Sequence, residues 1–67
     1  MLKVIEVLAE SETGWEAAAR SAVEEANRTL RNVRSIYIEN FEAQIADGRI
    51  AKYRINAKIT FELEETR

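Results

Sequence analysis

The chain has 67 residues, with 10 Lys and Arg against 12 Asp and Glu, and a formal net charge of −2. This charge argues against a nucleic-acid-binding domain, which normally carries a clear basic excess. Cys and His are both absent, which excludes disulfides, His-based nucleophile systems and the usual zinc ligands.

The short length predicts self-association of a single domain spanning residues 1–67. A domain of this size buries only about 60% of the surface that its unfolded chain exposes, so it is marginal alone. Small scaffolds compensate with disulfides, a metal or association with further copies. Because Cys and His are absent, a homo-oligomer is expected.

Hydropathy indicates no membrane partner. No apolar run approaches the ~18 residues that a membrane span needs. The stretch from Met1 to Leu8 is short and contains Lys3 and Glu6, unlike a secretory signal peptide. The expected location is therefore the cytoplasm.

The first half predicts a strand followed by a helix. In the strand Leu2 to Ala9, both faces are largely apolar, so we expect one to meet the helix and the other a second subunit. Ser11 or Thr13 is the expected helix cap, with Glu16 completing a capping box. The helix has an apolar, alanine-rich stripe at 3–4-residue spacing: Trp15, Ala18, Ala19, Ala22, Val23, Ala26, Leu30 and Val33.

Charges on the other side of the predicted helix include an expected i,i+4 pair between Glu24 and Arg28. Residues 32–34 are the expected helix end. Trp15 is interpreted as an anchor of the helix start against the sheet, with ligand stacking as the alternative.

The second half predicts an antiparallel hairpin. Residues 35–46 form the second strand, in which the apolar parity changes near Glu39 and Asn40 and indicates a β-bulge. Asp47-Gly48 is a strong hairpin-turn signal. Apolar and polar residues then alternate from Arg49 to Glu64, as in a half-buried strand. The fold class is therefore α+β, with a three-stranded antiparallel sheet in the order β-α-β-β and one helix packed on it.

The sequence contains no recognisable catalytic or phosphate-binding motif. The two glycines, Gly14 and Gly48, lie 34 positions apart, so they form no Gly-rich phosphate loop. Acidic pairs such as Glu24-Glu25 and Glu64-Glu65 are interpreted as solvated surface. We therefore expect a protein that is not an enzyme and has no catalytic residue.

The chain resembles the dodecin family along nearly its whole length. The resemblance rests on Val4-Ile5-Glu6-Val7, the turn from Ser11 to Gly14, the helix end Thr29-Leu30-Arg31-Asn32-Val33, and residues 53–65. Dodecins are small bacterial and archaeal proteins that form hollow homododecamers of tetrahedral symmetry. Many bind flavins (riboflavin or FMN) by stacking pairs of rings between tryptophans, with a Gln hydrogen-bonded to the ring. The resemblance thus implies a homododecamer with a small-molecule or ion ligand.

The positions of the flavin site differ from the family pattern. Ser35 stands where the stacking Trp is expected and Arg54 where the Gln is expected. Ser has no aromatic face, and Arg cannot accept a hydrogen bond. Arg54 could instead hold an anion or pair with Glu39 or Glu42. The candidate ligand-binding residues are Ser35, Arg54 and Asn40.

The resemblance places the chain closest to the dodecins that lack this Trp, some of which bind Ca²⁺. No metal ligand can be named from the sequence, because carboxylates of several subunits would have to converge. The expected function is a shell that binds, stores or buffers a small ligand or ion. The alternatives are a flavin-storage protein and a structural shell without ligand.

Overall fold

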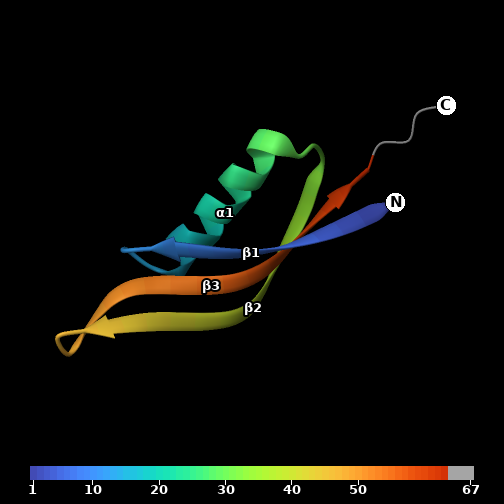
Figure 1. Ribbon diagram of the computed structural model, residues 1–67. Coiled ribbons are helices and arrows are strands. Elements are labelled where there is room, and N and C mark those ends of the chain that lie inside the picture. The colour runs from blue at the N-terminus through green and yellow to red at the C-terminus, as the bar shows by residue number, and fades with distance from the viewer. Residues whose placement is uncertain (64–67) are drawn as a thin grey trace.

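A computed structural model describes residues 1–63 as one helix on a three-stranded sheet. The elements are β1 (Leu2–Ser11), α1 (Trp15–Thr29), β2 (Val33–Ala46) and β3 (Arg49–Glu62). The sheet order is β1-β3-β2, and both pairings are antiparallel. The helix lies on one face of the sheet and leaves the other face open (Figure 1). The predicted α+β class and β-α-β-β order are confirmed.

The core lies between α1 and the central strand β3. Ile55, Ala57 and Ile59 of β3 are all 0% exposed, as is Ala18 of α1. Ala22 and Ala26 contact Ile59 in a second cluster. The small alanine side chains let the helix approach the sheet closely, and the larger isoleucines fill the remaining space.

The two faces of β1 differ in burial as the alternation predicts. Ile5 and Val7 point towards the helix and are partly buried. Leu2, Val4 and Leu8 point to the open face and are 59%, 55% and 70% exposed. Within one chain, nothing among residues 1–63 covers this apolar row.

The hairpin follows the sequence signals closely. The register shifts between Ile38 and Asn40, so the bulge predicted near Glu39 and Asn40 is confirmed. Asp47 and Gly48 both have positive φ, 54° and 75°, as a two-residue type I′ turn requires. The register of β2 on β3 shifts at two further places, between Val33 and Ser35 and between Gln44 and Ile45. These two shifts were not predicted.

The helix ends earlier than the sequence suggested. It stops at Thr29, and Leu30 is already extended, with φ −113° and ψ 149°. Asn32 adopts a left-handed φ of 61°, which Asn tolerates better than most residues. The chain therefore reverses at Asn32, so that Val33 begins β2 and the expectation that it lies on the helix was wrong.

The predicted side-chain cap was also wrong. Gly14 is the N-cap residue, and no side chain caps the helix. The Ser11 hydroxyl instead accepts a hydrogen bond from the Thr13 backbone N–H at 3.0 Å, which closes the turn before the helix. Glu16 pairs with Arg20 at 3.2 Å.

The polar face of α1 differs from the prediction in one ion pair. Arg28 pairs with Glu25 at 3.1 Å and not with Glu24, since residues three apart are also neighbours on a helix. The predicted strand end at Glu64 and the pair Glu64-Glu65 lie outside the described residues. No helix within residues 1–63 has the length and apolar character needed to cross a membrane.

Candidate ligand-binding face

Arg54 lies on the central strand β3, opposite the end of β1, on the open face of the sheet. The alternation along β3 points Ile55 to the helix and Arg54 to the opposite side. The register places Glu10 of β1 and Glu42 of β2 directly beside it. Residues opposite each other on antiparallel strands lie close enough for their side chains to interact. The guanidinium of Arg54 is thereby flanked by the carboxylates of Glu10 and Glu42.

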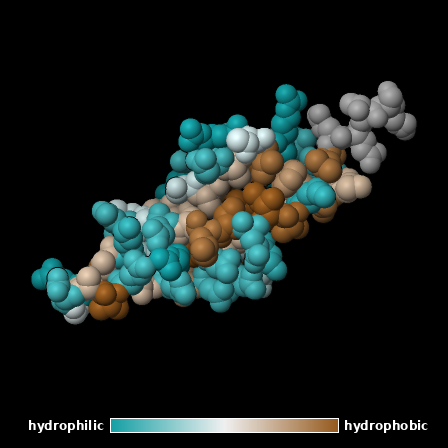
Figure 2. Space-filling view, viewed as in Figure 1, coloured by the Kyte–Doolittle hydropathy of each residue, from teal (hydrophilic) through white to brown (hydrophobic). Residues whose placement is uncertain are grey.

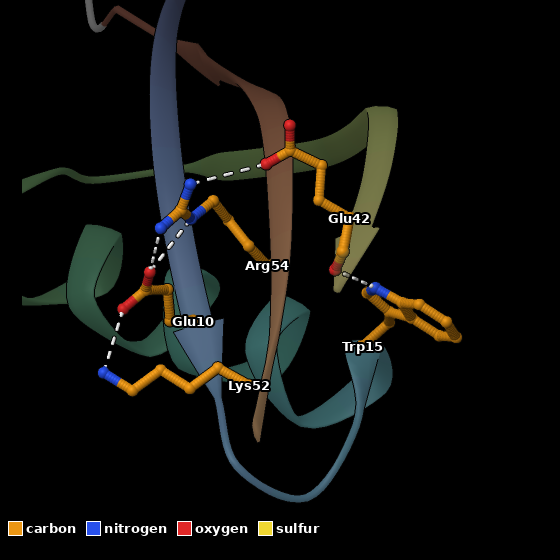
Figure 3. A network of polar contacts seen from close by, with 5 residues as sticks. All are labelled: Glu10, Trp15, Glu42, Lys52 and Arg54. Carbon is orange, nitrogen blue, oxygen red and sulfur yellow. Dashed lines mark hydrogen bonds and ion pairs between the residues drawn. The ribbon is translucent and has the colours of Figure 1, made fainter. Parts of the chain in front are cut away.

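Both carboxylates contact the guanidinium (Figure 3). Arg54 donates from Nε at 2.9 Å and from Nη2 at 2.7 Å to Glu10 Oε2. Its Nη1 lies 3.5 Å from Glu42 Oε1. On the other side, Lys52 Nζ lies 3.6 Å from Glu10 Oε1. The network thus links all three strands through side chains.

The network shifts the pKa values of Glu10 and Arg54, which form its shortest ion pair. The hydrogen bond from Arg54 lowers the pKa of Glu10 below its ordinary value, against a smaller opposing effect of burial, and Lys52 lowers it further. The same hydrogen bond raises the pKa of Arg54. Each group therefore stabilises the charged form of the other.

The predicted partners of Arg54 were partly correct. Glu42 does contact it. Glu39 pairs with Lys58 instead, with 3.9 Å between Glu39 Oε1 and Lys58 Nζ. Glu10, the nearest partner, was missed. Only the pairing of β1 with β3 brings Glu10 opposite Arg54, and the sequence does not reveal which strand occupies the centre of the sheet.

Ser35 and Asn40 lie on the same open face as Arg54, Asn40 two positions along the strands from it and Ser35 much further away. Ser35 is opposite Thr60, and Asn40 is opposite Asn56. Both are exposed. The six positions from Arg54 to Thr60 span roughly 20 Å at about 3.3 Å per residue. One chain therefore does not bring Ser35 and Arg54 into a common pocket.

Trp15 occupies the helix side of the same region. Its ring meets Phe41 and Tyr53 edge-on, with centroid distances of 5.6 and 4.9 Å. Its Nε1–H donates to the backbone oxygen of Glu42 at 2.8 Å. The first residue of α1 is thus fixed to β2 and β3, in agreement with its interpretation as an anchor.

The acidic residues that the structure describes do not form a metal site within one chain. Within residues 1–63, no three carboxylates come together in a way that could hold a metal ion. Glu10 and Glu42, the two carboxylates that share a neighbour on the open face, both form ion pairs with Arg54.

Comparison with known proteins identifies the family. The dodecin family model matches residues 1–64. This chain belongs to the dodecin family. A dodecin of Thermus thermophilus is 31% identical over 64 residues, which are 96% of this chain and 93% of that protein.

Solved dodecin structures share the fold of this family member. Dodecin from Streptomyces coelicolor is 35% identical, with a TM-score of 0.92 over 98% of this chain and 94% of that one. A calcium dodecin of Mycobacterium tuberculosis, described as a calcium-chelating antigen with a novel calcium-binding site, is 25% identical. Its TM-score is 0.83, over 100% of this chain and 96% of that one. The fold and the family are thus established together.

Proposed function

We propose that this dodecin-family chain assembles into a hollow homododecamer that binds and stores a small ligand or ion and catalyses no reaction. The exposed apolar row on β1 is the observation that carries the proposal. Leu2, Val4 and Leu8 are each more than half exposed although they share one face, on which Leu2 and Val4 are neighbours and Leu8 follows after Glu6. Such a patch is typical of an interface, because covering it removes apolar surface from water.

The ligand is not a flavin held in the stacked manner of many dodecins. Ser35 has no ring to stack on, and stacking on an aromatic side chain contributes about 1–3 kcal/mol in comparable base–aromatic contacts. We place the chain in the branch of dodecins that lack this Trp. A divalent cation held by carboxylates of several subunits is the ligand that we favour, in line with the similarity to a calcium dodecin.

A bound anion at Arg54 is the less favoured ligand. Glu10 and Glu42 already neutralise the guanidinium from both sides, and an incoming anion would have to displace one of them. The same closed network supports the second candidate function, a structural shell without ligand, in which Arg54 serves to join the three strands.

Native mass spectrometry of the purified protein tests both candidates. Twelve chains with additional mass would support the ligand-carrying shell and would give the ligand mass. Twelve chains that stay bare after incubation with Ca²⁺ and with riboflavin would favour the structural shell. A monomer or dimer at micromolar concentration would contradict the proposed assembly.

A further inference from the structure

The turn of the β2–β3 hairpin has little support from the rest of its chain. Close to the turn, the register of β2 on β3 shifts, and such a shift interrupts the ladder of hydrogen bonds. Two residue pairs lie between this shift and the turn, Ile45–Ile50 and Ala46–Arg49. We call residues 45–50 the hairpin tip. Figure 1 shows it at the far end of the two-stranded ribbon, beyond the ends of α1 and β1.

The hairpin tip is open to solvent. All of its residues are exposed, and no atom lies within 4 Å of a Cβ built on Gly48. Figure 2 shows the tip as a narrow projection with mostly hydrophilic atoms at its end. Within residues 1–63, no hydrogen bond or ion pair holds the Asp47 side chain. Because an isolated two-stranded ribbon is marginally stable in water, we expect the tip to open far more often than the core of the sheet.

The backbone of Asp47 favours this opening. Its φ of 54° is left-handed, a conformation that is less favourable for a residue with a Cβ than for Gly. The closed turn holds Asp47 in this conformation, and opening releases it to the wider range that such a residue prefers. The open turn samples the backbone angles at which the Gly48 nitrogen reaches the carboxyl carbon of Asp47, Cγ.

Asp47-Gly48 also has the residue types that attack by this nitrogen requires. Asp and Asn form a five-membered ring with the next backbone nitrogen, whereas Glu would need a less favourable six-membered ring. Asp47 is the only Asp in the chain, and Gly48 has no side chain to shield its nitrogen. Each Asn is followed by a larger residue, and three of the four lie within α1, β2 or β3: Asn27, Asn32, Asn40 and Asn56.

We infer that the Asp47–Gly48 bond is a site of spontaneous isomerisation to isoaspartate. The Gly48 nitrogen loses its proton and attacks Asp47 Cγ, the bond from Cγ to the hydroxyl oxygen breaks, and one water leaves, which gives a succinimide ring. Water then adds to the main-chain carbonyl carbon of Asp47. The bond from that carbon to the Gly48 nitrogen breaks, so the chain continues through Cγ. The water released in the first step is taken up in the second, and no other reactant is needed.

Isoaspartate is incompatible with the observed turn. It adds one methylene carbon to the backbone and leaves a free carboxylate on Cα. The length of a two-residue turn sets the register of its strands, so the altered link cannot keep Ala46 opposite Arg49. Beyond the register shift, β3 packs on α1 through buried residues such as Ile55 and Ile59. We therefore expect the hairpin tip to lose its pairing and the core of the sheet to keep it.

Ageing of the purified protein at neutral pH and physiological temperature tests the site. Trypsin releases Asp47 in the peptide that spans residues 35–49. The isoaspartyl form of this peptide elutes apart from the parent at unchanged mass, and fragmentation that cuts the Cα–Cβ bond locates it. Deamidation of Asn40 in the same peptide is recognised by its change of mass. The expected result is an isoaspartyl peptide, modified at residue 47, that accumulates with time.

Two variants at the same position serve as matched controls. Asp47→Glu should lose the product entirely, because its ring would have six members. Asp47→Asn keeps a residue type that accepts positive φ and should react faster than wild type, since an amide is a better target than a carboxylate at neutral pH. A synthetic peptide of residues 35–49 gives the rate without the fold.

The outcomes decide between a reactive and a protected turn. A folded protein that stays unmodified while the synthetic peptide isomerises would overturn the inference, because the closed turn would then block the attack. Isoaspartate at Asn40 and none at Asp47 would also overturn it. Neither result depends on how many chains assemble.

Hydrogen exchange of the aged protein gives a second, independent measurement. The isoaspartyl form should exchange its amide hydrogens faster at residues 45–50 and at an unchanged rate around Ile55 and Ile59. Unchanged exchange at the hairpin tip of this form would contradict the expected loss of the turn.

Discussion

Arg54 and Glu10 face each other across β3 and β1, and the guanidinium donates twice to one carboxylate oxygen, at 2.7 and 2.9 Å. Their side chains are only 30% and 36% exposed. Glu42 contacts the same guanidinium from the other strand. The residue at the position expected to bind ligand is therefore a link between the three strands of its own sheet.

The Arg54–Glu10 contact should stabilise the protein at neutral pH, and this stabilisation should be lost in acid. Because the pKa of Glu10 is lowered in the folded chain, its contribution is complete above the ordinary value of 4.5 and is lost as the pH falls through the lowered pKa. The melting temperature of wild type should exceed that of Glu10→Gln at pH 7 by a few degrees at most, and this difference should shrink as the pH falls below 4.5. Glu12→Gln, an exposed carboxylate outside the network, is the control. A difference between wild type and Glu10→Gln that stays constant with pH would contradict the assignment.

Restoring the family's flavin residues should create flavin affinity. Ser35→Trp with Arg54→Gln should quench riboflavin fluorescence with a Kd about 5- to 150-fold below that of wild type, as expected from about 1–3 kcal/mol of stacking per ring. Ser35→Trp alone separates stacking from the loss of Arg54. Because Ser35 and Arg54 are far apart in one chain, the gain should require the assembled particle. No gain in a variant that remains dodecameric would show that other parts of the pocket also differ.

The exposed row on β1 should be essential for assembly. Val4→Asp places a carboxylate in this row, between Leu2 and Glu6 on the same face of β1, with Leu8 beyond Glu6. Desolvating an unpaired charge in an apolar interface is costly, so the twelve-chain species should be lost in size-exclusion chromatography with light scattering. Asn27→Asp adds the same charge to an exposed helix position and should leave the particle intact. Equal elution of the two variants would argue against an interface on this face.

The hairpin turn should tolerate only a residue that accepts positive φ. Gly48→Ala should destabilise the protein by about 1–2 kcal/mol, the usual cost of a left-handed conformation for a residue with a Cβ. No atom lies within 4 Å of a Cβ built on Gly48, so the cost is one of backbone conformation. Gly14→Ala is the matched control, since its backbone is extended and its Cβ site is also empty. Urea unfolding followed by Trp15 fluorescence measures both, and equal midpoints would refute the turn assignment.

Much of the fold was predictable because local patterns carry it. The alternation from Ala51 to Phe61 made β3 recognisable, and its buried members are the core of the molecule. Asp47-Gly48 fixed the hairpin turn, since only a few residue types accept two successive positive φ values. The parity change before Phe41 located the bulge. The helix end was misplaced because Leu30 and Val33 also fit helical spacing, and the left-handed Asn32 leaves only a weak signal.

The candidate site was less predictable because its contacts join distant strands. Arg54 and Glu10 are 44 positions apart, and neither residue type indicates the other. The sequence by itself determined the elements and their faces, since these depend on periodicity and turn chemistry, and it predicts a partner from the small size of the core. Only the tertiary structure decided that β3 lies between β1 and β2, because strand order depends on the packing of the whole sheet against α1. That order places Arg54 between two carboxylates, Glu10 and Glu42.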